Sequence, residues 1–286
     1  MSAGVPAPPC ARHPQRAAAV RCARCDRPIC TECMVQAPVG WQCPDCVGAA
    51  AKRSPTVRPF ARGANTGIIG STNPTPAVIA LVALNVVCFV ASGFGSASVI
   101  DKLGMWPNGV HYLHEDYRVV TSMFLHLDVL HIVSNMFTLL IVGPAVEFML
   151  GRTRFVTLYM LAGIGGSVAF YLIAPAPSVA AGASGAIFGV MGAYVVLALR
   201  QHKPMGPVVA LIAINLVIGF ADPNIGWQAH VGGLVVGAAL AFFDDVALGL
   251  RAQGPRLAVA WGSSAATLAV LAALLFGIAP GHVNLS

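Results

Sequence analysis

The segment GASGAIFGVMGAYVVLAL, residues 182–199, begins an apolar stretch with a serine set among glycines. A second apolar stretch begins with HVGG, residues 230–233, and a third carries His131 and Asn135 four positions apart. Apolar spans usually exclude such side chains, because each desolvated polar group costs on the order of several kcal/mol. Polar residues that gather in three apolar spans are therefore candidates for function.

The composition predicts an all-α polytopic membrane protein. Of the 286 residues, 57% are hydrophobic and only 10% are charged, whereas soluble domains usually carry about a quarter of charged residues. A membrane-spanning helix needs about 20 apolar residues. The charge-poor stretches predict seven spans: Ala77–Phe94, Val129–Leu150, Phe155–Ala174, Ser184–Leu199, Val208–Ala221, Trp227–Phe243 and Leu257–Ile278.

The basic residues predict the orientation. If the N-terminus is cytoplasmic, only Lys102 and Arg118 of the 17 Lys and Arg residues lie outside, as the positive-inside rule requires. We therefore expect a multi-pass protein of the plasma membrane with an extracytoplasmic C-terminal tail, residues 281–286. The first 50 residues lack an apolar core of signal-peptide length, so the first span should be an uncleaved anchor. The net charge of +6 is then a topology signal, and we expect no nucleic-acid partner.

Seven of the eight cysteines lie before residue 47, and with one histidine they form four pairs, each separated by two residues. Zinc prefers thiolate and imidazole ligands, and such pairs can hold an ion from a tight turn. We expect two structural Zn²⁺ ions in a domain of residues 1–50. A disulfide framework is disfavoured in a reducing cytoplasm; redox sensing by the thiolates is the other alternative. The eight predicted ligands are Cys10, His13, Cys22, Cys25, Cys30, Cys33, Cys43 and Cys46.

This pattern resembles the cross-brace of B-box and RING domains. The resemblance implies that the first and third pairs share one ion and the second and fourth pairs the other, although spacing alone does not fix the pairing. Nothing in the segment indicates catalysis, so we expect a docking or regulatory role with a possible cytoplasmic protein partner. Residues 51–75, rich in Pro, Gly, Ser and Arg, predict a flexible basic linker along the inner leaflet. Cys88, alone in the first span, is expected to be a small buried hydrophobe.

The predicted topology brings the polar residues to one depth. His131, Ser184 and His230 each lie near the outer start of a span that runs inward. Ser184 in the first turn of a helix has unpaired backbone N–H groups beside it, which suits an oxyanion. His230 is the expected base, because no other base lies at that level of the two spans. Small-residue ridges would bring the two helices close together; they comprise Gly185, Gly189, Gly233 and Gly237.

The second span supplies further donors. His131 and Asn135 are one helical turn apart and face the same way. Asn135, with His131 above it, can donate to the negative oxygen that develops in the reaction, and the Ser184 N–H supplies another donor.

These motifs resemble those of the rhomboid intramembrane serine proteases over residues 76–245. The family pattern H-x4-H-x3-N matches His126, His131 and Asn135; G-x-S-G matches residues 182–185, and H-x-G-G matches residues 230–233. The resemblance implies a six-helix core, a Ser184–His230 dyad, and an oxyanion hole formed by His131, Asn135 and the Ser184 backbone. The seventh span, within residues 246–286, is similar to one found in some members.

The aromatic-Arg pair of the family's first external loop is matched by Tyr117-Arg118, with Tyr where many members have Trp. Phe188 stands where some members stack a tyrosine on the catalytic histidine. We expect Tyr117 and Arg118 to brace the loop Gly95–Phe124, which should dip into the outer leaflet, and His126 to hold this loop to the second span.

Two acidic residues receive structural interpretations. Asp128 is expected to be an N-cap, which leaves a dyad without a third member. Glu147 is expected to form an ion pair with Arg152 or Arg154 at the inner face.

The sequence therefore predicts an intramembrane serine endopeptidase whose substrates are membrane proteins with helix-unstable transmembrane segments. Two other classes stay open. A catalytically silent relative would bind membrane clients, but such relatives usually lack the serine or the histidine. A transporter would carry its polar residues at the bilayer centre, whereas here they gather towards one side.

Overall fold

The computed structural model describes residues 7–37, 40–53, 75–249 and 253–277. The chain forms two compact units, Met1–Ala64 and Asn65–Ser286. Most of the predicted linker (residues 54–74) and the predicted C-terminal tail lie outside the described residues.

The first unit has short strands and one helix. Strands β1 (Val20–Arg21) and β2 (Pro28–Ile29) pair antiparallel, as do β3 (Val35–Gln36) and β4 (Trp41–Gln42). The 3₁₀ helix η1 spans Thr31–Cys33, and helix α1 (Pro44–Arg53) runs three residues into the predicted linker. The buried residues of this unit are five of its cysteines together with Ile29. Such a small apolar core rarely stabilises a fold, so this unit depends on its cysteines.

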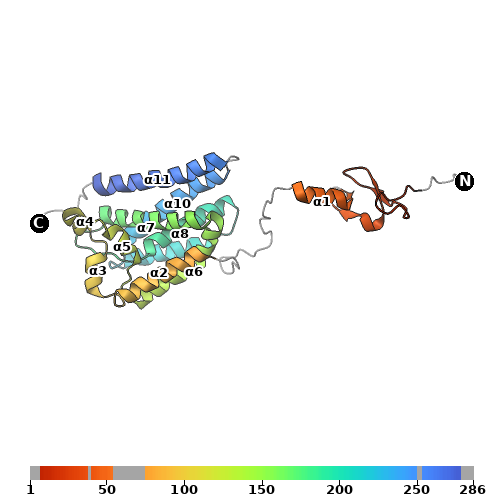
Figure 1. Ribbon diagram of the computed structural model, residues 1–286. Helices are drawn as coiled ribbons and strands as arrows, with labels where there is room; N and C mark the ends of the chain where they lie inside the picture. Colours follow the sequence, from red (N-terminus) through yellow and green to blue (C-terminus); the bar gives the residue numbers. More distant parts are fainter. Residues whose placement is uncertain (1–6, 38–39, 54–74, 250–252, 278–286) are drawn as a thin grey trace. The chain divides into compact units, whose positions relative to one another are not determined.

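The second unit is a bundle of apolar helices (Figure 1). Each predicted span overlaps one helix in the described part of the chain. By length and composition, α6 and α7 could each cross a membrane, and four further apolar helical stretches are shorter: Pro76–Ala91, Ser184–Arg200, Gly206–Ala221 and Trp261–Gly277. The number of membrane crossings stays a prediction. The helices are α2 (Pro76–Ala91), α6 (Val129–Leu150), α7 (Arg152–Ile173), α8 (Ser184–Arg200), α9 (Gly206–Ala221), α10 (Trp227–Gly249) and α11 (Gln253–Gly277).

The segment between α2 and α6 is helical in large part. It contains α3 (Ala97–Leu103), α4 (Pro107–Leu113), α5 (Arg118–Thr121) and the 3₁₀ helix η2 (Ser122–Phe124). The helices α3 to α5 gather at one end of the bundle (Figure 1). There, the segment buries three apolar side chains in one cluster with the C-terminal end of α7; this cluster includes Met105, Val110, Val119, Phe170 and Tyr171.

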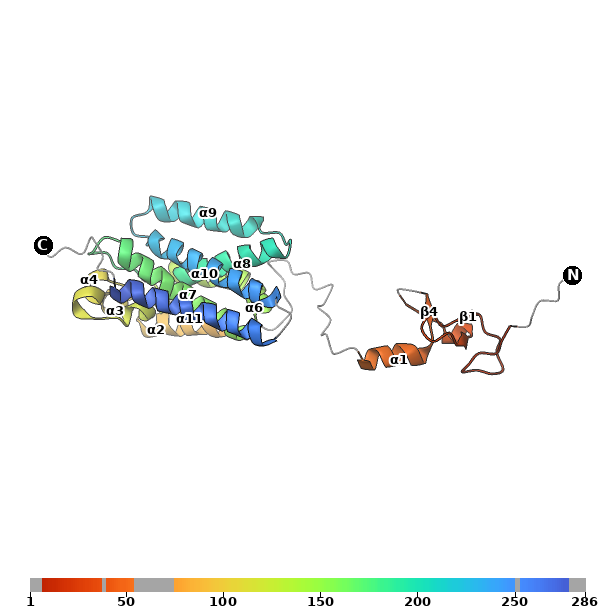
Figure 2. The ribbon, with the colours of Figure 1, turned by 90° about the horizontal axis from the view of Figure 1, so that it is seen from above.

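Helix α8 lies at the centre of the bundle. It makes its most extensive contacts with α10 and also packs on α7 and α6. Glycines bring the two backbones together: a methyl group on Gly237 would overlap the carbonyl oxygen of Gly189, and one on Gly233 would overlap that of Gly185. Helix α9, in contrast, lies at the edge of the bundle (Figure 2) and buries only Val208 and Gly219.

The α8–α10 contact gives a stability prediction. Gly237→Ala forces the helices apart, and overpacking of this kind costs about 1–3 kcal/mol. Thermal unfolding in detergent micelles should show the loss. Gly262→Ala on α11 is the control, because no atom lies within 4 Å of the added methyl group. Equal destabilisation by both substitutions would contradict the close contact.

Glu147 corrects one expectation from the sequence. Glu147 is only 4% exposed, and its two carboxylate oxygens accept hydrogen bonds from the backbone N–H groups of Ala77 (3.2 Å) and Val78 (2.9 Å). The expected ion pair with Arg152 or Arg154 is therefore wrong; Arg154 instead faces Asp244, with 4.0 Å between Nε and Oδ1. The first N–H groups of a helix have no partner within it and carry partial positive charge. The carboxylate thus caps α2 from α6.

Glu147→Ala should lower the free energy of unfolding by about 2–3 kcal/mol, because two hydrogen bonds to a charged acceptor are lost inside the bundle. Arg152→Ala should leave the stability unchanged. Chemical unfolding in mixed micelles compares the two variants, and an equal loss in Arg152→Ala would restore the ion-pair interpretation.

Candidate active site and zinc module

Ser184 and His230 meet across the α8–α10 contact. Ser184 is the first residue of α8, and His230 lies in the first turn of α10. The Ser184 Oγ is 2.9 Å from His230 Nε2, although the residues are 46 positions apart. Phe188, one turn after the serine, stacks on the imidazole with ring centroids 4.3 Å apart and an interplanar angle of 8°. Helix α8 therefore carries both the Ser184 hydroxyl and the Phe188 ring, and both contact the His230 imidazole.

Among the described residues, no carboxylate pairs with the other ring nitrogen of His230. His230 Nδ1 is buried and makes no hydrogen bond to any residue that the structure describes. Gly219 of α9 lies beside it, where a methyl group would stand 3.6 Å from Nδ1. In the described part of the chain, Ser184 and His230 therefore form a hydrogen-bonded pair to which no third side chain is joined at Nδ1.

His131 lies on the other side of the serine. Gly182 has a φ of +142°, which favours glycine, and a side chain there would come within 2.9 Å of His131 Nε2 and 3.6 Å of Ser184 Oγ. His131 Nδ1 accepts a long hydrogen bond from the Leu127 N–H, at 3.4 Å. A neutral imidazole that accepts at Nδ1 carries its proton at Nε2. His131 can therefore present an N–H group to the space above Ser184.

Asn135 lies one turn from His131 and is 7% exposed. Its Nδ2 donates to the His131 carbonyl of its own helix at 3.0 Å. A carboxamide carries two N–H protons, so one donor remains after this bond. The membership of Asn135 in the site stays a prediction, since its hydrogen bond is with its own helix.

Asp128 and His126 hold the start of α6. Asp128 is the N-cap of α6, as expected, and accepts from the His131 N–H at 2.8 Å. His126 is completely buried, and its ring lies edge-on to Phe89 of α2 at 6.4 Å and to His131 at 5.1 Å between centroids. The His126 ring thus separates α2 from the site histidine.

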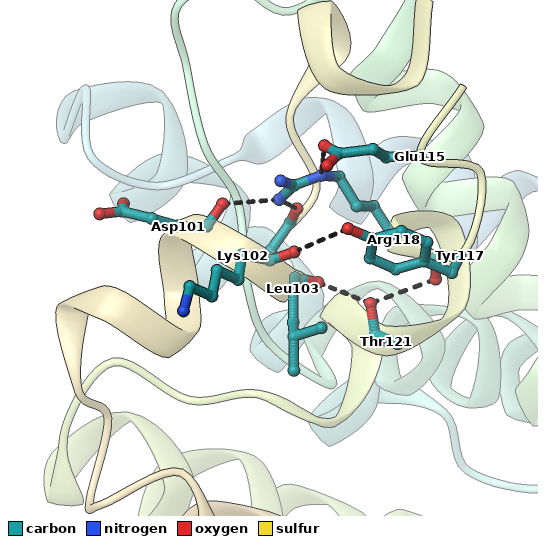
Figure 3. A network of polar contacts seen from close by, with 8 residues as sticks. Asp101, Lys102, Leu103, Glu115, Tyr117, Arg118 and Thr121 are labelled. Carbon is teal, nitrogen blue, oxygen red and sulfur yellow. Dashed lines mark hydrogen bonds and ion pairs between the residues drawn. The ribbon is translucent and has the colours of Figure 1, made fainter. Parts of the chain in front are cut away.

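Arg118 organises the segment between α2 and α6 (Figure 3). Its Nη1 donates to the carbonyl oxygens of Asp101 and Gly104, each at 2.8 Å, and its Nε donates to Glu115 at 2.6 Å. The guanidinium also lies over the Trp106 and Tyr117 rings. The Arg118 hydrogen bond lowers the pKa of the Glu115 carboxyl below its usual value. The buried cation is therefore paired with one carboxylate and two backbone carbonyls.

Two hydroxyl groups complete this network at the end of α3. Tyr117 Oη donates to the Lys102 carbonyl at 3.3 Å, and Thr121 Oγ1 donates to the Leu103 carbonyl at 2.6 Å. The carbonyls of the last helical turn have no partners within the helix, and these side chains satisfy them in sequence order. Sequence reasoning missed Glu115 and Thr121; their spacing of three residues on either side of Arg118 was the available signal.

The cysteine module brings its eight ligands together in two groups. In each group the ligand atoms lie within 4.8 Å of one another. The Cys25 and Cys43 sulfurs are 3.7 Å apart, and His13 Nδ1 lies 3.5 and 3.4 Å from the Cys30 and Cys33 sulfurs. Zn–S bonds of about 2.3 Å place two thiolates of one tetrahedron roughly 3.7 Å apart, so the donor set fits zinc. The groups are Cys10, His13, Cys30 and Cys33, and Cys22, Cys25, Cys43 and Cys46.

Comparison with known proteins identifies both units. A Rhomboid domain family model matches residues 113–244, and a B-box zinc finger model matches residues 5–37. The chain belongs to the rhomboid family, whose members are integral membrane proteins that act on membrane-protein substrates. Its N-terminal unit is a B-box-like zinc-binding module. The B-box match ends before Cys43 and Cys46, which complete the second ligand group from the start of α1.

Three relatives place the chain within the family. It is 37% identical over 205 residues to rhomboid protease GluP of Bacillus subtilis (strain 168), covering 68% of this chain and 38% of that protein. It is 32% identical to putative rhomboid protease YdcA of the same organism over 58% of this chain and 87% of that protein. RHOMBOID-like protein 6, mitochondrial, of Arabidopsis thaliana is 36% identical over 51% of this chain and 50% of that protein.

The ligand groups give a metal-binding prediction. The wild-type chain should hold two zinc ions, and Cys25→Ser should lower the content to one because only one tetrahedron loses a thiolate. Cys88→Ser is the control, since Cys88 lies outside both groups. Metal analysis of the purified chain measures the content, and chelation should unfold the module. A content unaffected by Cys25→Ser would contradict the assignment.

Proposed function

We propose that this protein is an intramembrane serine endopeptidase that uses Ser184 and His230 as a catalytic dyad. The observation that carries the proposal is the 2.9 Å contact between Ser184 Oγ and His230 Nε2 at one end of an apolar bundle. His230 takes the serine proton as Ser184 attacks the scissile carbonyl, and then gives it to the leaving amine. A water molecule, activated by the same imidazole, releases the acyl group from the serine.

The donors around Ser184 support an oxyanion hole. The backbone N–H of Ser184 at the start of α8, the Nε2–H of His131 and the remaining N–H of Asn135 are the proposed donors. Such groups stabilise the negative oxygen of the tetrahedral intermediate because they are already oriented when charge develops. Phe188 keeps the His230 ring in register with the serine during both proton transfers.

Lateral access of a substrate helix is supported by α9. This helix covers His230 Nδ1 with Gly219 but buries little else, so its displacement disrupts few contacts. A transmembrane substrate must unwind to present an extended backbone to Ser184. We therefore propose that the substrates are membrane proteins with small or helix-breaking residues near the outer end of a transmembrane segment.

The remaining assignments are part of the same proposal. Residues 76–245 form the protease core, and the chain crosses the plasma membrane with its N-terminus in the cytoplasm and its C-terminus outside. Residues 1–50 bind two structural zinc ions and a cytoplasmic partner, residues 51–75 link the units, and residues 246–286 contain the additional span. The Arg118 network braces the segment that contacts the outer leaflet.

A catalytically silent, client-binding relative is the second candidate. It is disfavoured because both dyad residues are present and in hydrogen-bond contact. The transporter alternative finds no support in the gathering of His131, Ser184 and His230 at one site.

The dyad is tested with two substitutions. Ser184→Ala and His230→Ala should each lower the cleavage rate of a transmembrane peptide by at least about 10³-fold, because members of a nucleophile–base unit fail together. A fluorophosphonate probe should label the wild type and not Ser184→Ala. Ser134→Ala is the matched control, since that hydroxyl is exposed and donates to its own helix. Cleavage retained by either dyad variant would refute the proposal.

A further inference from the structure

The turn after α2 packs closely against the backbone of His126 and Leu127, just before α6 begins. Gly93, Phe94 and Gly95 all have positive φ, of +70°, +58° and +87°. A methyl group on Gly95 would lie 2.7 Å from the Leu127 carbonyl carbon and 2.8 Å from the His126 carbonyl oxygen, and it would overlap the Leu127 oxygen. Only a residue without a side chain lets these two backbones lie this close.

The same segment fixes the orientation of His131. The Leu127 N–H is the hydrogen-bond donor to His131 Nδ1, at 3.4 Å. The His126 ring packs edge-on against the His131 ring, with 66° between the planes, and is itself backed by Phe89 of α2. His131 is therefore held at its Nδ1 edge by a backbone amide and on one side by a buried ring.

We infer that Gly95 and His126 are positioning residues that hold His131 with its Nε2–H directed towards the oxyanion of the proposed reaction. Neither residue touches the reacting atoms. Gly95 allows the Leu127 peptide to lie where its N–H reaches His131 Nδ1, and this bond selects the tautomer that donates from Nε2. The inference deepens the proposed protease function and depends on it for its kinetic consequence.

The contribution of His126 is its shape. Both ring nitrogens are buried, and neither makes a well-aligned hydrogen bond to the residues that the structure describes. A phenylalanine ring has the same planar form and can fill the space between Phe89 and His131. His126→Ala removes the ring that packs against His131, so the His131 ring becomes free to rotate.

The first experiment compares two glycines of one turn. Gly95→Ala and Gly93→Ala both place an alanine at positive φ, so both carry backbone strain. The methyl group on Gly93 meets only Ser96 Cβ, at an ordinary 3.6 Å. Loss of one oxyanion donor lowers kcat by about 10²–10³-fold. Gly95→Ala should therefore lower kcat by about 10- to 100-fold with KM within about threefold, whereas Gly93→Ala should stay near the wild type. Equal kcat values for the two variants would overturn the role of Gly95.

A double-mutant cycle with His131→Ala tests the route of the effect. If Gly95 acts through His131, Gly95→Ala should lower kcat by less than about twofold in the His131→Ala background. The same 10- to 100-fold loss in both backgrounds would show that Gly95 acts elsewhere. An unchanged kcat in His131→Ala alone would instead refute the oxyanion role of His131.

Histidine ¹⁵N resonances of the full chain in micelles give a readout that needs no activity. His131 should appear as the Nε2–H tautomer in the wild type and in Gly93→Ala, and should lose that preference in Gly95→Ala. If the wild type cleaves no substrate, the proposed function fails while this measurement still decides the positioning. An Nδ1–H tautomer in the wild type would overturn the inference.

The His126 variants cover the case in which Gly95→Ala does not fold. His126→Phe should keep kcat within about threefold of the wild type, because the ring contact survives. His126→Ala should lower kcat about 10-fold or more at similar KM and lose the His131 tautomer preference. Loss of activity in His126→Phe to the level of His126→Ala would show that the imidazole nitrogens, and not the ring shape, are required.

Discussion

The close approach of α8 and α10 is the constraint on which the site depends. Helices inside a bilayer gain little from the hydrophobic effect against one another, so their association relies on close packing. Glycines on both helices remove the side chains that would hold the backbones apart. The helix starts are then near enough for a serine hydroxyl and an imidazole to form a hydrogen bond without any additional loop.

A second constraint is the need to satisfy every polar group in an apolar bundle. The described part of the chain does so for several buried side chains, often through backbone atoms, whereas His230 Nδ1 and the His126 ring nitrogens have no well-aligned partner there. Glu147 caps α2, Arg118 binds the last carbonyls of α3, and Asn85 donates to the Leu81 carbonyl of its own helix at 2.8 Å. Glu147 and Arg118 each join two elements, and Asn85 also reaches the Tyr159 hydroxyl of α7 at 3.5 Å. Such hydrogen bonds are stronger in an apolar interior than in water. The polar contacts therefore help the apolar core to hold together the elements around the site.

The two units differ in the kind of residue that they bury in their cores. The helical unit buries a continuous apolar core, whereas the N-terminal unit buries mainly cysteines. A chain segment this short gains much of its folding free energy from bound metal. The ligand groups are interleaved, so each one joins two ligand pairs that are separated by a pair of the other group.

The sequence by itself determined the membrane class and the apolar helices, and it proposed the residues of the candidate site. Those features follow from composition, from the spacing of polar residues within apolar spans and from ligand pairs two residues apart, all of which are local. The capping role of Asp128 was also predictable, because an N-cap bonds within its own helix turn. The tertiary structure decided what depends on contacts between distant segments. The partner of Glu147 was predicted wrongly because its actual partners are backbone N–H groups of α2. Every non-proline residue has such a group, so the sequence does not single these two out. The ligand grouping, the contact of Gly95 with Leu127 and the Thr121 hydrogen bond were likewise set by chain topology, since backbone atoms and through-space distances have no local sequence pattern.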